Sequence, residues 1–220
     1  MSILNTSDEL RPRGIKTDRI FRILLNNPGG NLTRYRISVL AKAQQIQVAI
    51  LLRRLEAMGL VGGTRVTDYR RLMMEWMKRE IKFPTQRYML KSIMELLRNA
   101  SIEYALTTYQ AETLVNGYLF PTKTELYIHQ HDFDRWHGEL VRAGALVGGG
   151  NVTLRLYDEG VFYNSFTTRD GYRIVSMPQL IVDLMREGGV ATDAAEMLLQ
   201  KQIESAKRVR KARKGTDSVF

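Results

Sequence analysis

Apolar residues in the first third of the chain recur at helical spacing in three successive segments. A first helix begins near Thr17, carries Ile20, Phe21 and Leu24 on its apolar side, and is stopped by the sequence NNPGG. Thr33 is a good N-cap for a second helix, 34–41, in which the inward positions lie four residues apart. A turn at Lys42 and Ala43 then leads to a third helix, which Gln44 caps and which ends at positions 58–59.

The sequence GLVGGTRVTD after the third helix predicts a tight two-stranded hairpin. Its arms are 60–61 and 65–66, and its tip is Gly62–Gly63. The order helix, helix, short turn, helix, hairpin is that of a winged helix-turn-helix domain, which we place at 17–67.

The third predicted helix has two unlike faces. Apolar residues at i, i+3, i+4, i+7 and i+10 form a core face: Val48, Leu51, Leu52, Leu55 and Met58. Glutamine can bond adenine edges and isoleucine can rest on a thymine methyl, and the N-terminal half of a recognition helix reaches bases. The predicted base contacts are therefore Gln44, Gln45, Ile46, Gln47 and Ile50. The alternative is that Ile46 and Ile50 pack on another element or a second subunit.

Cationic residues around this helix are candidates for the DNA backbone, because phosphate contacts fix the position of a protein on the duplex. The second helix opens on Arg34, Tyr35 and Arg36, where its N–H groups also face outward. The remaining predicted backbone contacts are Lys42, Arg53, Arg54 and Arg65. Solvated arginines that contact nothing are the alternative at the second helix.

Beyond the hairpin, the pattern predicts two more helices and then a mixed α/β region. The helices, 69–83 and 86–99, would form a helical bridge over 68–100. Strands are predicted at 124–130 and at 151–157, and the period-two alternation of the second segment indicates one face in water. Other strands are predicted at 103–107, 160–166 and 172–176. The predicted fold class is α+β, with these parts: a flexible arm 1–16, the winged helix-turn-helix 17–67, the bridge 68–100, an α/β domain 101–206 and a basic tail 207–220.

Charge is unevenly distributed along the chain, whose formal net charge is +10. Residues 1–99 hold 19 Lys and Arg against 8 Asp and Glu, residues 100–199 hold 7 against 13, and residues 200–220 hold 7 against 2. This segregation indicates that one part of the chain meets a polyanion. The tail KRVRKARKG is either a second DNA contact or a solvated segment.

Several functional classes lose support from composition. The chain has no cysteine, so disulfides and thiolate metal sites are excluded. No apolar run approaches the ~18 residues that a membrane span needs, and the N-terminus has no signal-peptide pattern. We therefore expect a cytoplasmic protein with no membrane partner.

Five segments together resemble the AbiEi family of transcriptional regulators, the antitoxins of type IV toxin–antitoxin systems. They are IEYALTTYQA, TELYIHQ, GGGNVTLRLYDEGVFY, RIVSMPQLIVDL and GGVATDAAEMLL, in this order. The resemblance covers about positions 17–203. It implies operator DNA binding, repression of the chain's own operon, and antitoxin function against a nucleotidyltransferase-like toxin, for which a stable complex is not required. The chain departs from the family at Lys42, where such turns usually have glycine, and in a short wing.

Other candidate sites give weaker signals. The sequence HQHDFDRWH gathers His129, His131 and His137, but their spacing does not guarantee a convergent metal site, so we expect no metal and no cofactor. Asp158 and Glu159 are adjacent and would diverge, which argues against a catalytic pair.

Two rival functions remain open. One is a divergent nucleotidyltransferase. The positions corresponding to its Gly-Ser pair and its metal-holding carboxylates would be Thr107–Thr108 and Glu125. The Gly-Ser pair is thus missing and only one acid remains, so we expect a degenerate core and no enzymatic activity. The other rival is a ligand-sensing winged-helix regulator unrelated to toxins. A homodimer is left open.

Overall fold

The structure is a computed structural model that describes residues 13–79 and 81–216, with side chains up to Arg208. The chain divides into two compact units. The sheet unit is Ile81–Val175, and the helical unit is formed by Lys16–Glu80 together with Ser176–Phe220. Residues 1–12 of the predicted arm 1–16 lie outside the described residues, and α1 begins at Ile15, two residues earlier than predicted.

The first half of the helical unit follows the predicted order of elements. Helices α1 (Ile15–Asn26), α2 (Arg34–Leu40) and α3 (Gln45–Ala57) precede a hairpin of β1 (Val61–Gly62) and β2 (Arg65–Val66). The Thr33 side chain accepts a hydrogen bond from the Arg36 N–H, which confirms the predicted cap. Gly62 pairs with Arg65, so the hairpin tip lies one residue later than predicted, at 63–64.

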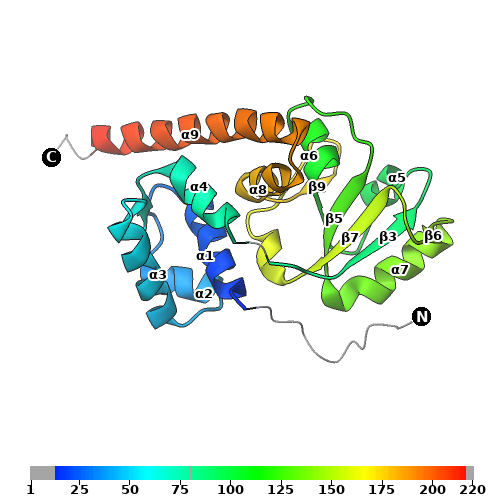
Figure 1. Ribbon diagram of the computed structural model, residues 1–220, viewed down its shortest axis with the longest axis horizontal. Helices are drawn as coiled ribbons and strands as arrows, with labels where there is room; N and C mark the ends of the chain where they lie inside the picture. The colour runs from blue at the N-terminus through cyan, green and yellow to red at the C-terminus, as the bar shows by residue number, and fades with distance from the viewer. Residues whose placement is uncertain (1–12, 80, 217–220) are drawn as a thin grey trace. The chain divides into compact units, whose positions relative to one another are not determined.

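The second half of the helical unit comes from the far end of the chain. α4 (Tyr69–Met77) packs against α8 (Met177–Glu187) and α9 (Val190–Thr216), and α8 packs along α9 (Figure 1). The predicted α/β domain 101–206 was therefore too long, because its last two helices complete the helical unit. An apolar face at 177–199 fits either unit equally well, and periodicity cannot tell which one it covers.

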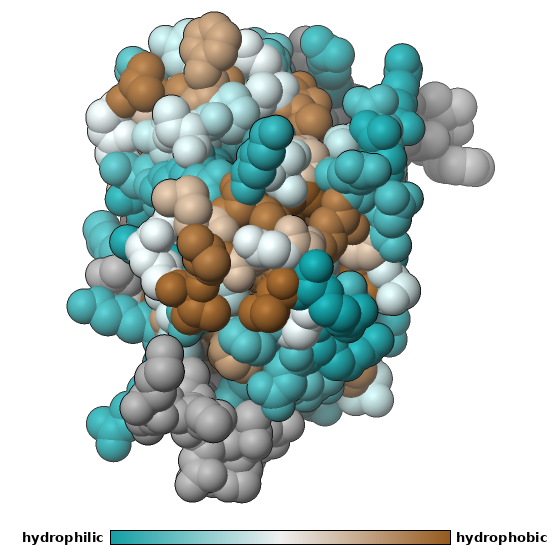
Figure 2. Space-filling view, turned by 90° about the vertical axis from the view of Figure 1, so that its right-hand side faces the viewer, coloured by the Kyte–Doolittle hydropathy of each residue, from teal (hydrophilic) through white to brown (hydrophobic). Residues whose placement is uncertain are grey.

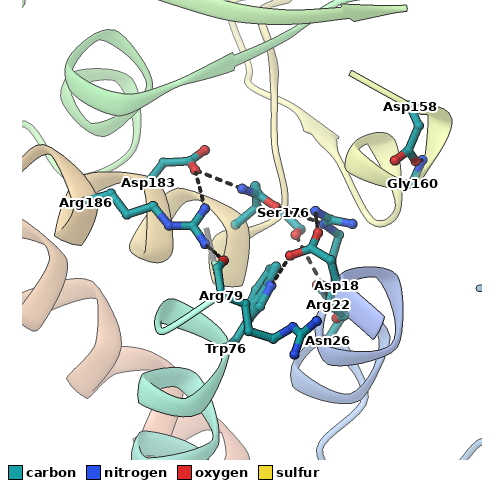
Figure 3. A network of polar contacts seen from close by, with 11 residues as sticks. Asp18, Arg22, Asn26, Trp76, Arg79, Asp158, Gly160, Ser176, Asp183 and Arg186 are labelled. Carbon is teal, nitrogen blue, oxygen red and sulfur yellow. Dashed lines mark hydrogen bonds and ion pairs between the residues drawn. The ribbon is translucent and has the colours of Figure 1, made fainter. Parts of the chain in front are cut away.

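A buried polar network explains why α8 belongs to this unit (Figure 3). Arg22 of α1 is fully buried; its Nη2 donates to Asp18 Oδ2 at 2.8 Å, and its Nε and Nη2 donate to Gln179 Oε1 at 2.9 and 2.7 Å. The indole N–H of Trp76 on α4 donates to the other Asp18 oxygen. Gln179 in turn donates to Asp183 at 2.9 Å. The Arg22 charge and its partners thus form one network that needs α1, α4 and α8 together.

The sheet unit contains, among the described residues, a seven-stranded mixed sheet in the order β6-β3-β7-β5-β4-β9-β8. Its centre is β7 (Val152–Tyr157) beside β5 (Thr124–His129), in parallel, and β4 (Ala105–Thr107), antiparallel to β5. The outer strands are β3 (Thr85–Met89), β6 (Leu146–Val147), β8 (Phe166–Thr167) and β9 (Arg173–Ile174). The helices are α5 (Met94–Arg98), α6 (Thr108–Val115) and α7 (Phe133–Arg142), with short 3-10 turns at Gln130–Asp132 and Glu159–Phe162.

The predicted helical bridge over 68–100 was wrong. α4 belongs to the helical unit, whereas the predicted helix 86–99 divides into strand β3 and the short helix α5. β3 pairs with β7 from Thr85↔Arg155 to Tyr88↔Val152, so a partner more than 60 positions away fixes its conformation. Local propensity cannot anticipate such pairing.

Two further strand predictions also need correction. β7 lies between β3 and β5, and nearly all of its residues are buried, so the expected wet face is absent from this strand. The segment 160–166 is mostly the 3-10 turn Glu159–Phe162 rather than a strand. Asp158 accepts a hydrogen bond from the Gly160 N–H there, which fixes a turn instead of a pairing edge.

Breaking the buried network should destabilise the helical unit. We expect Asp18→Asn to lower its free energy of unfolding by about 3–5 kcal/mol, because Arg22 would keep a buried charge without its counter-ion. Urea unfolding followed by Trp76 fluorescence, in a Trp136→Phe background, measures this. The double variant Asp18→Asn, Arg22→Met should lose less than the sum of the single losses. A shift no larger than that of the exposed control Glu204→Gln would contradict the prediction.

Candidate nucleic-acid interface

The turn between α2 and α3 decides how α3 is presented to solvent. Lys42 adopts a left-handed conformation, with φ of 48°. Its N–H donates to the Val39 carbonyl at 3.1 Å, and the Ala43 N–H donates to the Ser38 carbonyl at 2.9 Å. These two bonds form a Schellman motif, in which glycine normally holds the left-handed position. Lys42, which stands where glycine is usual, therefore keeps the turn's hydrogen bonds intact and adopts a strained backbone conformation there.

α3 buries one side and exposes the other. Val48, Leu52 and Leu55 are buried, whereas Leu51 and Met58, predicted to be core, are half-buried. On the opposite side Ile46 and Ile50 are each 59% exposed. Neither isoleucine is covered by another element within the described residues, so packing inside the same chain does not explain them. An exposed pair of β-branched residues one turn apart is a surface that another molecule can cover.

The predicted glutamines are exposed, but they are not equivalent. Gln44 is the N-cap of α3, and its backbone N–H donates to the Gln47 side-chain oxygen at 3.2 Å. This bond occupies the Gln47 oxygen in capping its own helix and leaves its amide N–H₂ for another partner. Gln45 precedes Ile46 at the start of α3 and is exposed. Gln45 is thus the glutamine whose side chain the cap does not use.

Cationic side chains are exposed on α2, on α3 and on β2. Arg34, Arg36, Arg53 and Arg65 are exposed and have no carboxylate partner within the described part of the chain, and Tyr35 is 63% exposed. Lys42 is also exposed. Arg54 differs from them, because its guanidinium lies 3.6 Å from Glu75 of α4. Arg54 is therefore the weakest of the predicted phosphate contacts.

The hairpin is held close to α3 and to the loop after α1. The Val66 N–H donates to the Pro28 carbonyl at 3.0 Å, and the Gly63 N–H donates to Glu56 of α3 at 3.1 Å. A Cβ on Gly30 would lie 2.9 Å from the Cβ of Arg65, so only glycine fits where the loop crosses β2. These contacts fix where Arg65 is presented.

The surplus of Lys and Arg over Asp and Glu lies wholly in the helical unit. Its residues, 16–80 and 176–220, include 21 Lys and Arg against 11 Asp and Glu, whereas 81–175 include 10 against 10. The acidic character that the sequence indicated for positions 100–199 thus divides between the units. A surplus of this size attracts a polyanion, and the attraction weakens as the salt concentration rises.

The nucleotidyltransferase-like positions of the sheet unit are occupied by structural contacts. Glu125, 5% exposed, receives a hydrogen bond from Arg155 and lies 2.9 Å from the Lys123 ammonium. Burial raises the pKa of this carboxyl, but the two cations outweigh that effect and hold its pKa below the usual value. Thr107 and Thr108 are fully buried where β4 meets α6. A carboxylate already neutralised in this way is poorly placed to hold a catalytic metal ion.

The histidines do not converge. His129 hydrogen-bonds Glu103 at 2.7 Å and stacks on His131, whereas His137 bonds the Tyr88 hydroxyl at 2.9 Å. No group of three or more metal-binding side chains occurs in the part of the chain that the structure describes. Glu159 is exposed, whereas Asp158 accepts a hydrogen bond within its own turn.

Apolar side chains also gather at the outer edge of the sheet unit. Figure 2 faces the β6 end and shows brown side chains grouped near its centre. Met89 and Leu146 are cross-strand partners and are 50% and 70% exposed. No helix among the described residues is long and apolar enough to cross a membrane.

Lys42 offers a direct test of the turn. We expect Lys42→Gly to raise the free energy of unfolding of the helical unit by about 0.5–1 kcal/mol, because glycine adopts the left-handed conformation without strain. Thermal unfolding measures the change. Lys42→Ala removes the same charge but keeps the strain, so it should not stabilise. If glycine proved no better than alanine here, the turn would not have the conformation described.

No protein-family model, no curated protein and no solved structure matches the chain. Function is therefore inferred from the geometry and charge of the described residues.

Proposed function

We propose that the chain is a sequence-specific double-stranded DNA-binding protein whose residues 17–67 form a winged helix-turn-helix. The observation that carries this proposal is the exposed face of α3, with Ile46 and Ile50 outward and uncovered. A helix of this length fits the major groove, and its first two turns are the part that reaches base edges.

The surroundings of α3 support the same function. The exposed arginines at the start of α2, on α3 and on β2 can meet phosphates on both sides of a groove. Gln45 and Ile46 are the strongest base contacts, Gln47 shares its amide with the helix cap, and Arg54 is held toward Glu75. The surplus of positive charge in the helical unit supplies the nonspecific part of binding.

The biological role that we propose is transcriptional repression of the chain's own operon, together with antitoxin activity. This part rests on the resemblance to the AbiEi family. The sheet unit is the candidate for antitoxin function, since it has no net charge of its own to attract nucleic acid.

Fluorescence anisotropy with the chain's own upstream DNA and a shuffled duplex of equal length tests DNA binding. We expect Gln45→Ala to lower the preference for the upstream DNA by about 1–3 kcal/mol while binding to shuffled DNA is unchanged. Arg53→Ala should weaken both duplexes alike and reduce the slope of log K against log salt by about 0.9. Lys91→Ala, on the sheet unit, is the charge-matched control.

Equal affinity of the wild type for both duplexes would refute sequence-specific reading. If both variants bound the two duplexes like the wild type, the DNA interface would not lie on α3.

Antitoxin activity is tested by growth. Co-expression of the chain with a nucleotidyltransferase-like toxin from the neighbouring gene should restore colony formation, because the resemblance implies neutralisation of such a toxin. Arg53→Ala should still rescue, since it changes only the DNA-binding face. Failure of the wild type to rescue would remove the antitoxin role and leave DNA binding untouched.

A further inference from the structure

α9 packs on the helical unit through its N-terminal half and becomes exposed beyond it. The packed face is buried as far as Leu199, Ile203 and Ala206 are half-buried, and Lys207 and Arg208 are exposed. In Figure 1 the red end of α9 extends beyond α4. The helix nevertheless continues to Thr216, so the predicted basic tail 207–220 is helical over most of its length.

Two contacts place the start of this basic segment beside the hairpin. Arg70 of α4 donates to both carboxylate oxygens of Glu196 on α9, at 2.9 and 2.7 Å. Further along α9, a groove is lined from both sides by residues that include Pro28, Val66, Ile203, Ala206 and Lys207. Val66 follows Arg65, a predicted phosphate contact, on β2. Lys207 and the hairpin therefore border the same groove.

The cations of this segment recur at helical spacing. Lys207, Arg210, Lys211 and Lys214 stand at i, i+3, i+4 and i+7, so their positions share one face of α9, which we call the basic face. The sequence has no Asp or Glu from 205 to 216, and Lys207 has no ion pair within the described part of the chain. Like charges at this spacing repel and destabilise a helix. The helix macrodipole favours cations in the last turn only, so it does not account for the whole face.

The spacing of these charges fits the backbone of a nucleic-acid duplex. Positions 207 to 214 extend about 10 Å along the helix axis, at 1.5 Å per residue. Over about 10 Å, double-stranded DNA has about six phosphate charges. The basic face also begins beside the hairpin, and it belongs to the unit that holds the surplus of positive charge. Both its charge and its position are thus complementary to a phosphate backbone.

We infer that the basic face of α9 binds phosphates of duplex DNA outside the segment that α3 reads. This second contact rests on the proposed DNA-binding function and extends its footprint beyond the hairpin. Phosphate contacts carry no sequence information, so the face adds affinity without base preference. About 10 Å of helix follows the backbone for about three base pairs, at 3.4 Å each.

Fluorescence anisotropy on the full chain tests the contact, with the chain's own upstream DNA and a shuffled duplex of equal length. The quadruple variant Lys207→Gln, Arg210→Gln, Lys211→Gln, Lys214→Gln should weaken binding to both duplexes about 10–100-fold at 0.1 M salt. The slope of log K against log salt should fall by about 2–4, because each lost phosphate contact contributes about 0.9. The ratio of the two affinities should stay within about twofold of that of the wild type, because phosphates are alike in both duplexes.

A matched control removes four cations from the surface of the sheet unit: Lys82→Gln, Arg87→Gln, Lys91→Gln, Arg169→Gln. Its net charge equals that of the α9 variant, so a difference between the two reports where the cations lie. An exchange variant, Lys207→Arg, Arg210→Lys, Lys211→Arg, Lys214→Arg, keeps every charge and should bind like the wild type. Glutamine forms helices about as well as lysine and arginine, so thermal unfolding of all three variants should match that of the wild type.

Hydroxyl-radical footprinting on the upstream DNA locates the contact. The wild type should protect about three more base pairs of backbone on one flank than the quadruple α9 variant does. The sheet-unit control should protect the same backbone as the wild type.

The outcomes separate the second contact from the proposed function. Equal loss of affinity and salt slope in the α9 variant and its control, or the same protected backbone in the α9 variant and the wild type, overturns the contact while DNA binding by α3 stands. If the wild type bound upstream and shuffled DNA alike, sequence-specific reading would fall, but a loss confined to the α9 variant would still establish the contact. A wild type that bound neither duplex would overturn both.

Discussion

The buried Arg22–Asp18 pair is the constraint on which the helical unit depends. A charge buried away from water is tolerated only when its counter-ion and its hydrogen-bond partners are in place. Asp18 is on the same helix, but Trp76 comes from α4 and Gln179 from α8, 157 positions away from Arg22. The N-terminal helices therefore cannot give Arg22 these partners without a segment from the other end of the chain, and the residues of the sheet unit lie between the two segments in the sequence.

This arrangement has consequences for the surface of the unit. α8 and α9 add both apolar cover and basic residues, so that the excess of positive charge belongs to one unit although its residues are separated in sequence.

The elements of the first 67 residues could be predicted because local signals determine them. Thr33 caps α2, the NNPGG sequence ends α1, and the glycines after α3 form the hairpin. The outward position of Ile46 and Ile50 also follows from helical periodicity alone. The segment 86–99 could not be predicted, since its apolar residues fit a helix locally while pairing with β7 places its first half in the sheet.

The sequence by itself determined the order of the first elements, the two faces of α3, the excess of positive charge and the absence of cysteine chemistry. Each depends on residue type and on spacing within a few turns. Only the tertiary structure decided which unit α8 and α9 complete, that Gln47 caps its own helix, and that Glu125 is neutralised by Arg155 and Lys123. Those features depend on the rotamers that side chains adopt and on contacts between residues distant in sequence, and periodicity carries no information about either.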